Sequence, residues 1–241
     1  MSTLDSGNMK TIGLLGGMSW ESTLGYYQAI NQGVKARLGG LHSAKIAMVS
    51  VDFAPIEALQ QAGNWDSSAE RLLEAANQIE AAGADCLLIC TNTMHKVAEE
   101  VEAAIQIPLL HIADATAQQL IDDGISQVGL LGTAFAMEQA FYKQRLKDKF
   151  GLQVQVPAQQ DRDIVHQVIY EELCLGICKQ ESKREYLRII EQLAKDGAQA
   201  VMLGCTEIAM LIQQAETEVK LIDTTAIHAE RAVQFALDGI C

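Results

Sequence analysis

Several features are missing from this 241-residue sequence, and each absence excludes a class of protein. No apolar run approaches the roughly 20 residues that cross a bilayer, so no membrane-spanning helix is expected. Acidic residues outnumber basic ones, 31 to 18, and the formal net charge is −13. A chain this acidic has no excess of Lys and Arg to neutralise phosphates, which argues against nucleic acid and anionic membrane surfaces as partners.

Export and cofactor signals are lacking as well. Residues 1–10 have neither the basic start nor the apolar stretch of a secretion signal. Six cysteines in such a chain favour free thiols in a reducing cytoplasm. Residues 13–19 lack the third glycine of a dinucleotide-binding loop, and no phosphate-loop or pyridoxal phosphate lysine motif is evident. No cysteine spacing completes a zinc site, so neither a metal nor a cofactor is expected.

The chain does contain short apolar runs that alternate with amphipathic stretches. This alternation predicts an α/β protein with parallel sheets and crossover helices. Gly83, Gly124 and Gly197 each follow a periodic stretch and are predicted to stop a helix. The expected strands are 12–15, 45–51, 86–90, 109–112, 128–131, 154–156, 201–203 and 221–222, and the expected helices are 22–37, 67–82, 96–104, 115–123, 137–149, 161–175, 182–195, 208–214 and 227–237.

The sequence also repeats itself. Residues 83–93, Gly-Ala-Asp-Cys-Leu-Leu-Ile-Cys-Thr-Asn-Thr, are similar to residues 197–207, Gly-Ala-Gln-Ala-Val-Met-Leu-Gly-Cys-Thr-Glu. Residues 11–18 and 127–134 repeat at nearly the same offset. A duplicated half predicts two pseudo-symmetric domains, each a short parallel sheet flanked by helices, with an active site in the cleft between them.

We expect the first domain to comprise residues 1–112 plus 219–241, and the second to comprise residues 113–218. The repeat aligns Thr91 with Cys205. Two proton-transfer groups facing one small site from opposite sides are what a reaction at a single carbon centre would need.

Ligand-binding residues are expected in the loops that follow the strands, because parallel sheets bind ligands at the carboxyl ends of their strands. Asn92 and Thr93 offer amide and hydroxyl groups where a strand passes into a helix, a suitable cradle for a carboxylate. A plain helix cap is the alternative interpretation of both residues. Cys205 stands at the equivalent junction, where a helix dipole would lower the pKa of a thiol and favour the thiolate.

Five motifs carry a resemblance to a known family. Three of them are residues 16–23, Gly-Gly-Met-Ser-Trp-Glu-Ser-Thr, residues 91–95, Thr-Asn-Thr-Met-His, and residues 204–207, Gly-Cys-Thr-Glu. The other two are residues 50–53 and 129–133. From Lys10 onward the chain resembles the aspartate/glutamate racemase family, and within it the broad-specificity amino-acid racemases. The resemblance implies two α/β domains, often in a homodimer, and cofactor-independent racemisation by two bases.

The sequence departs from the family pattern at three positions. Thr91 stands where the family has its first catalytic cysteine, and Cys90 one place earlier should face away from the substrate, because strand neighbours alternate. Glu57 and Cys174 stand where typical aspartate racemases have basic residues for the distal carboxylate. We therefore expect an asymmetric racemase, faster from the enantiomer that faces Cys205, acting on aspartate, glutamate or a broader set that includes homoserine.

A wider group of residues is expected to hold the amino-acid substrate. Amide, hydroxyl and backbone groups would stabilise the carbanion through its carboxylate. Asp52 would orient the ammonium or serve as a helix cap, and Glu207 would orient Cys205. The expected substrate-binding residues are Met18, Ser19, Asp52, Gln60, Asn92, Thr93, Thr133, Thr206 and Glu207.

Three other functions remain open at this point. A relative of the same fold could isomerise or decarboxylate a dicarboxylic acid through the same cysteine. A non-catalytic amino-acid-binding protein is favoured by the missing first cysteine. A two-domain protein with a vestigial site is the third.

Overall fold

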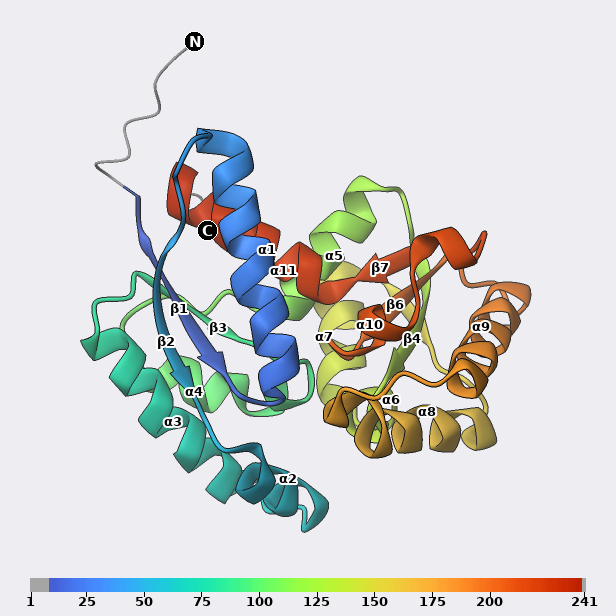
Figure 1. Cartoon of the computed structure of the whole chain (residues 1–241). Helices are drawn as coiled ribbons and strands as arrows, with labels where there is room; N and C mark the ends of the chain where they lie inside the picture. Colours follow the sequence, from blue (N-terminus) through green and yellow to red (C-terminus); the bar gives the residue numbers. More distant parts are fainter. Residues whose placement is uncertain (1–8, 240–241) are drawn as a thin grey trace. The chain divides into compact units, whose positions relative to one another are not determined.

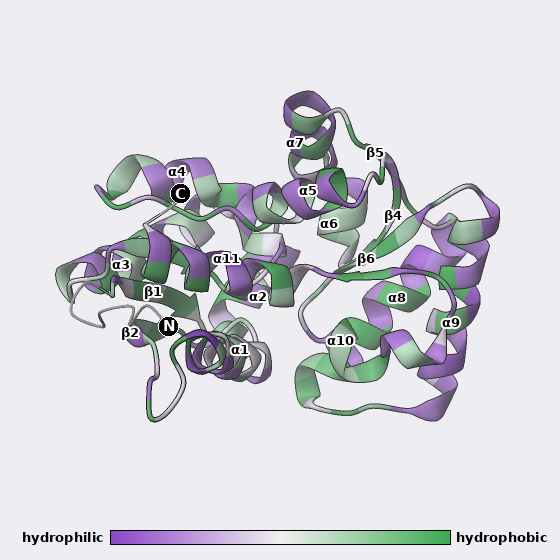
Figure 2. Ribbon diagram, turned by 90° about the horizontal axis from the view of Figure 1, so that it is seen from above, coloured by the Kyte–Doolittle hydropathy of each residue, from purple (hydrophilic) through white to green (hydrophobic). Residues whose placement is uncertain are grey.

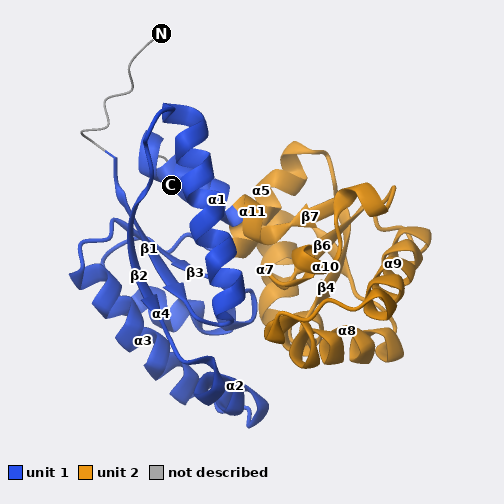
Figure 3. Ribbon diagram, viewed as in Figure 1, with its two compact units in different colours: residues 1–111, 228–241 blue, residues 112–227 orange. Residues whose placement is uncertain are grey.

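The structure is a computed structural model that describes residues 9–239 (Figure 1). The first eight residues of the segment read above for a secretion signal lie outside this range. The chain divides into two compact units, one formed by Met1–His111 with His228–Cys241 and the other by Ile112–Ile227 (Figure 3). Among the described residues, no helix is both long and apolar enough to cross a membrane.

The first unit is built on a parallel three-stranded sheet of order β2-β1-β3. Leu109 adds an isolated parallel bridge to Leu87 at the edge of β3. The elements are β1 (Thr11–Gly16), α1 (Trp20–Leu38), β2 (Lys45–Ser50), α2 (Phe53–Gln61), α3 (Trp65–Ala81), β3 (Cys86–Ile89), a 3-10 turn (Thr93–Val97) and α4 (Ala98–Ala104), with the later part of α11 (Thr224–Asp238).

The second unit is built on a parallel four-stranded sheet of order β5-β4-β6-β7. The β4 strand corresponds to β1 in the sequence repeat, and β6 corresponds to β3. The elements are α5 (Ile112–Asp122), β4 (Gln127–Gly132), α6 (Ala134–Glu138), α7 (Ala140–Phe150), β5 (Gln153–Gln155), α8 (Gln159–Glu171), a 3-10 turn (Leu173–Leu175), α9 (Gln180–Lys195), β6 (Ala200–Gly204), α10 (Ile208–Leu211), a 3-10 turn (Gln214–Glu216) and β7 (Leu221–Asp223).

The inner strands β1, β4 and β6 are apolar and almost fully buried, whereas the edge strands β2 and β5 are partly exposed. In the first unit, Leu15, Leu87 and Ile89 pack in one cluster with α3, whereas Leu14 and Leu88 pack in another with α1 and α11. Figure 2 shows β1, β4 and β6 mostly in green and the surface helix α9 largely in purple. Coverage of both faces by helices is what makes the strands of a parallel sheet read as continuous apolar runs.

The predicted fold class is confirmed: two small parallel sheets, each flanked by helices. The division of the chain differs slightly from the one expected, because β7 pairs with β6 and groups residues 219–227 with the second unit. Gly83 and Gly197 have φ of 85° and 106°, a conformation that favours glycine at the end of a helix.

Several local expectations were wrong. No helix was expected between residues 51 and 64, where the structure has α2, which begins where Asp52 accepts a hydrogen bond from the Ala54 N–H. The helix expected over 161–175 ends at Glu171, and a 3-10 turn follows. The strand expected over 109–112 is reduced to the single bridge at Leu109, because α5 already begins at Ile112.

Candidate active site

The β1–α1 turn of the first unit is closed by its own side chains. The Gly17 N–H donates to Thr23 Oγ1 at 2.8 Å, so this donor is engaged within the chain. Ser19 caps α1 by accepting from the Ser22 N–H at 3.4 Å. Met18 is 3% exposed and packs in the core. The structure therefore gives Met18 and Ser19 packing and capping duties in this turn.

The end of β3 brings three of the expected residues together. Thr91 is half-buried, while Asn92 and Thr93 are buried in the turn that follows. His95 fixes this turn, because its Nδ1 lies 2.8 Å from the Thr91 carbonyl oxygen, which can only accept. The hydroxyl of Thr91 is thus carried on a backbone segment with a defined conformation.

Cys90 is a core thiol of the first unit. It is fully buried and packs in the cluster that contains Leu14, Tyr26 and Leu88. Burial raises the pKa of the Cys90 thiol far above its usual range. Cys90 is therefore unsuited to replace the cysteine that is missing at position 91.

Asp52 and Gln60 lie on α2, at its start and its end. Asp52 is exposed and lines an open hollow of about 240 Å³ together with Arg71 and Glu74. Neither Thr91 nor the buried residues after it line this hollow. Gln60 is buried, and its Nε2 donates to Met94 Sδ at 2.9 Å.

A group of histidines lies next to the Thr91 turn. His228 Nε2 is 2.6 Å from the Leu110 carbonyl oxygen, so it carries the proton, and Tyr26 OH donates to His228 Nδ1 at 2.8 Å. The ring centroids of His95 and His228 are 5.9 Å apart. Burial lowers the pKa of His228 to about 4, so this ring is neutral at pH 7.

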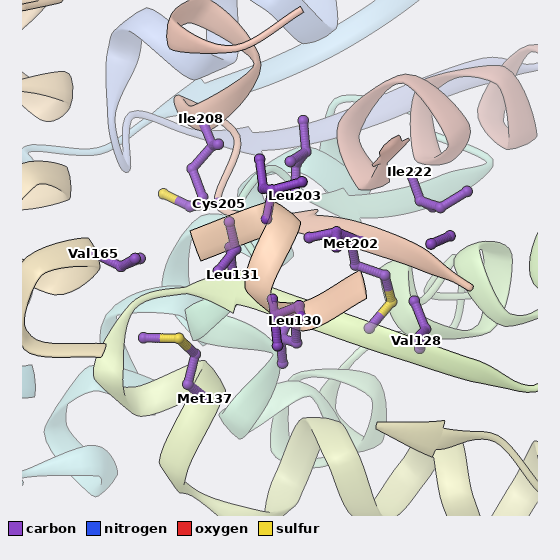
Figure 4. Close-up of a cluster of buried hydrophobic side chains, with 14 of the residues drawn as sticks. Val128, Leu130, Leu131, Met137, Val165, Met202, Leu203, Cys205, Ile208 and Ile222 are labelled. Atoms are coloured by element: carbon purple, nitrogen blue, oxygen red, sulfur yellow. The ribbon is translucent and has the colours of Figure 1, made fainter. Parts of the chain in front are cut away.

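Cys205 follows β6 in the second unit and is held by its neighbours. It is 8% exposed and lies in the apolar cluster beside Leu203 and Ile208 (Figure 4). Its Sγ donates to Glu207 Oε2 at 3.0 Å, and Thr206 Oγ1 donates to the same oxygen at 2.7 Å.

The pKa of Cys205 moves opposite to the sequence-based expectation. Burial raises the pKa of this thiol well above its usual range, and the Glu207 carboxylate raises it further. The following helix, α10, has only four residues, so its dipole offers little compensation. The expectation of a lowered pKa was therefore wrong.

Thr133, the counterpart of Gly17, caps α6. Its Oγ1 accepts from the Ala136 N–H at 3.3 Å, and the side chain is buried. The neighbouring Ala134 N–H donates to His166 Nδ1 at 3.1 Å. These contacts keep the turn after β4 in place.

The sequence analysis missed one contact, between Cys174 and Glu207, and one residue, Thr225. Cys174 donates its thiol to Glu207 Oε1 at 3.9 Å, a contact that sequence separation hides. Thr225 follows β7 and is buried, and its hydroxyl has no hydrogen-bond partner in the described part of the chain. The polar Asp223-Thr224-Thr225 segment directly after an apolar strand was the available signal. Within residues 9–239, no group of three or more His, Cys, Asp or Glu side chains could hold a metal ion.

Comparison with known proteins relates this geometry to a family. The sequence profile described as Asp/Glu/Hydantoin racemase matches residues 15–232. The chain belongs to this racemase family. It is accordingly an amino-acid racemase, and the family recognised from its motifs is confirmed.

Individual relatives agree with this assignment. The broad-specificity amino-acid racemase RacX of Bacillus subtilis (strain 168) is 21% identical over 175 residues, which are 70% of this chain and 72% of RacX. A Yersinia pestis protein with a provisional Asp/Glu racemase assignment is 54% identical, with TM-score 0.88 over 95% of this chain and all of its own. An aspartate racemase homologue from Pyrococcus horikoshii OT3 is 31% identical, with TM-score 0.82 over 95% of this chain and 99% of its own.

Proposed function

We propose that the chain racemises an acidic or broader amino acid without pyridoxal phosphate, with Cys205 and Thr91 transferring the α-proton. The observation that carries the proposal is the equivalence of these two residues. Thr91 follows β3, which pairs with β1, and Cys205 follows β6, which pairs with β4, the counterpart of β1 in the repeat. The two residues also coincide in the sequence repeat.

The proposed chemistry depends on stabilising a carbanion. Buried hydroxyl and amide groups next to the two residues, namely Asn92, Thr93 and Thr206, are proposed to bind the substrate carboxylate. Thr225 adds a buried hydroxyl after the neighbouring strand β7. Such donors act more strongly in a site from which water is excluded.

The proposed substrate range follows from Glu57 and Cys174, the two positions that lack the basic side chain of typical aspartate racemases. Glu57 on α2 is acidic, and the Cys174 thiol is engaged by Glu207. Neither can hold a distal carboxylate as Lys or Arg would. We therefore expect a side chain that is neutral, as in homoserine, or a carboxylate held by amides such as that of Gln60.

Proton NMR in D₂O tests the function directly. Aspartate, glutamate and homoserine are supplied as separate L and D enantiomers to the wild type and to Cys205→Ser. Wild type should remove the α-proton signal of at least one amino acid, and Cys205→Ser should slow this by about 100-fold or more, the scale of one acid–base group. Binding without exchange would instead support an amino-acid-binding protein, and a changed product without exchange would support isomerisation or decarboxylation of a diacid.

The role of Thr91 is tested by Thr91→Cys. A thiol of pKa about 8.5 is a far stronger acid than a hydroxyl, so the variant should raise racemisation in both directions. Polarimetry starting from a saturating concentration of each enantiomer measures kcat in the two directions. Wild type should be faster from the enantiomer whose α-hydrogen faces Cys205. No gain in a correctly folded variant would show that Thr91 is not the second base.

Assembly and location are further parts of the proposal. Trp20, Leu24 and Tyr27 form an exposed apolar stripe on α1, which a second copy of the chain would cover in a homodimer. No disulfide joins the cysteines within residues 9–239, which suits a reducing compartment such as the cytoplasm. Sedimentation at several concentrations tests the dimer.

A further inference from the structure

The strongest unassigned feature is the Glu207 carboxylate, which three side chains share. Cys205 Sγ and Thr206 Oγ1 both donate to Oε2, at 3.0 and 2.7 Å, and Cys174 Sγ donates to Oε1 at 3.9 Å. Glu207 is only 2% exposed. All four residues belong to the second unit, so the cluster is defined within one compact body.

We propose that Glu207 is a positioning residue that accepts the Cys205 thiol proton, so that Cys205 acts as a base only together with this carboxylate. The inference rests on the proposed racemase function and deepens it. It extends the expected role of Glu207 from orienting Cys205 to accepting its proton. It also replaces the helix-dipole account of how Cys205 becomes reactive.

Geometry and charge both support the dyad. At 3.0 Å the sulfur and Oε2 are close enough for a proton to pass directly between them. Thr206 donates to the same oxygen, which fixes the side chain of Glu207. The side chains of Glu207 and Cys174 both add to burial in raising the pKa of Cys205, and only the Glu207 backbone N–H opposes them. Cys205 is therefore protonated as a thiol in the resting protein, with the Glu207 carboxylate beside it.

The proton steps balance without an additional reactant. The Cys205 S–H bond breaks and an O–H bond forms on Glu207, leaving a thiolate next to a carboxylic acid. The thiolate then takes the α-hydrogen of the substrate, and the electron pair of the broken C–H bond stays on the α-carbon. In the reverse direction Cys205 returns a proton to carbon and recovers its own from Glu207.

The test compares Glu207→Gln with wild type in two assays. The amide keeps the size of the side chain and removes its charge and basicity. In D₂O, α-proton exchange should fall by about 100-fold or more, as expected for loss of one acid–base group. The pH midpoint for alkylation of Cys205 by iodoacetamide, followed peptide by peptide by mass spectrometry, should fall by about 1 unit or more, because a neighbouring negative charge is removed.

These two changes have opposite signs, which a merely structural role would not produce. A control is Glu138→Gln. Glu138 lies in the same unit and accepts from Arg162 Nε at 2.9 Å, and it is not among the groups that shift the pKa of Cys205. This control should leave both the exchange rate and the Cys205 alkylation midpoint unchanged.

Each outcome is decisive. Exchange that is unchanged or faster in folded Glu207→Gln would overturn the proposal, as would lost exchange with an unchanged alkylation midpoint. If Glu207→Gln does not fold, Glu207→Asp replaces it: the carboxylate is kept but lies one methylene farther from Cys205, so α-proton exchange should fall, and unchanged exchange would overturn the proposal. Absence of exchange in wild type would instead remove the racemase function itself, and the dyad with it.

Discussion

Single residues of this protein differ in how far the sequence reveals their duties. Thr91 and Cys205 could be selected from the repeat because it aligns them without any structure. The duties of Ser19, Asp52 and Thr133 could not be separated in this way. Each is a hydroxyl or carboxylate after a strand, and the structure shows each of them capping a helix. Capping and ligand binding require the same side-chain types at the same loops.

His228 supports a prediction about acid stability. Its pKa is lowered from 6.5 to about 4 in the folded protein because the ring is fully buried. The unfolded chain therefore binds this proton first, so stability should be lost as the pH falls from about 6.5 to about 4. The loss amounts to about 3 kcal/mol from this group alone.

Urea unfolding between pH 7 and 4 measures this effect by comparing wild type with His228→Gln. The variant should be less stable at pH 7 but should lose less stability on acidification. His42→Gln changes an exposed histidine and should follow the wild-type curve. Parallel curves for wild type and His228→Gln would show that the buried ring does not set the acid limit.

At the scale of elements, the β1–α1 turn imposes the strictest local requirement. Gly17 has φ of 94°, and a Cβ atom there would lie 2.2 Å from the Val51 carbonyl oxygen. Gly17→Ala should therefore lower the free energy of unfolding by about 3 kcal/mol, through backbone strain and the clash. Thermal unfolding followed by circular dichroism measures the change.

Gly25 is the matched control for this turn. It lies inside α1, and a Cβ atom there would meet nothing within 4 Å. Gly25→Ala should stabilise the protein by about 0.5–1 kcal/mol, because alanine loses less backbone freedom in a helix. Equal effects of the two substitutions would contradict the steric explanation for Gly17.

The elements that the sequence analysis missed have identifiable causes. No helix was expected over residues 53–61, which directly follow a strand; they include Pro55, and proline is tolerated in the first turn of a helix. The expected helix at 137–149 is divided at Gln139, which adopts an extended conformation between α6 and α7. Breaks of this kind depend on packing that periodicity does not record.

At the scale of the whole molecule, the two units differ in the number of chain segments that form them. The second unit is continuous from Ile112 to Ile227, whereas the first needs residues 228–241 in addition to 1–111. Val233 and Phe235 of α11 are buried with Leu14 and Tyr26 in one cluster. The first unit is therefore incomplete without the end of the chain.

This difference predicts how fragments behave. Residues 112–227 should fold alone and unfold cooperatively, because their core is self-contained. Residues 1–111 should remain unfolded, since losing α11 removes about 5 kcal/mol or more of apolar burial, comparable with the total stability of a small domain. Circular dichroism melts measure both fragments. A version in which residues 1–111 are joined to 228–241 by a Gly/Ser linker should recover a cooperative transition, and its failure would contradict this account.

The sequence by itself determined the α/β class, the duplicated halves and the family. The spacing of apolar residues, the glycines that end helices and the repeated motifs are all local features that can be recognised in the sequence alone. Only the tertiary structure decided the state of Cys205. Its pKa depends on burial and on the Glu207 and Cys174 side chains, and Cys174 lies 31 positions away in the chain. Local sequence placed a thiol after a strand. Three-dimensional packing buried that thiol, and this burial, with the charges of Glu207 and Cys174 adding to it, reversed the expected direction of the pKa shift.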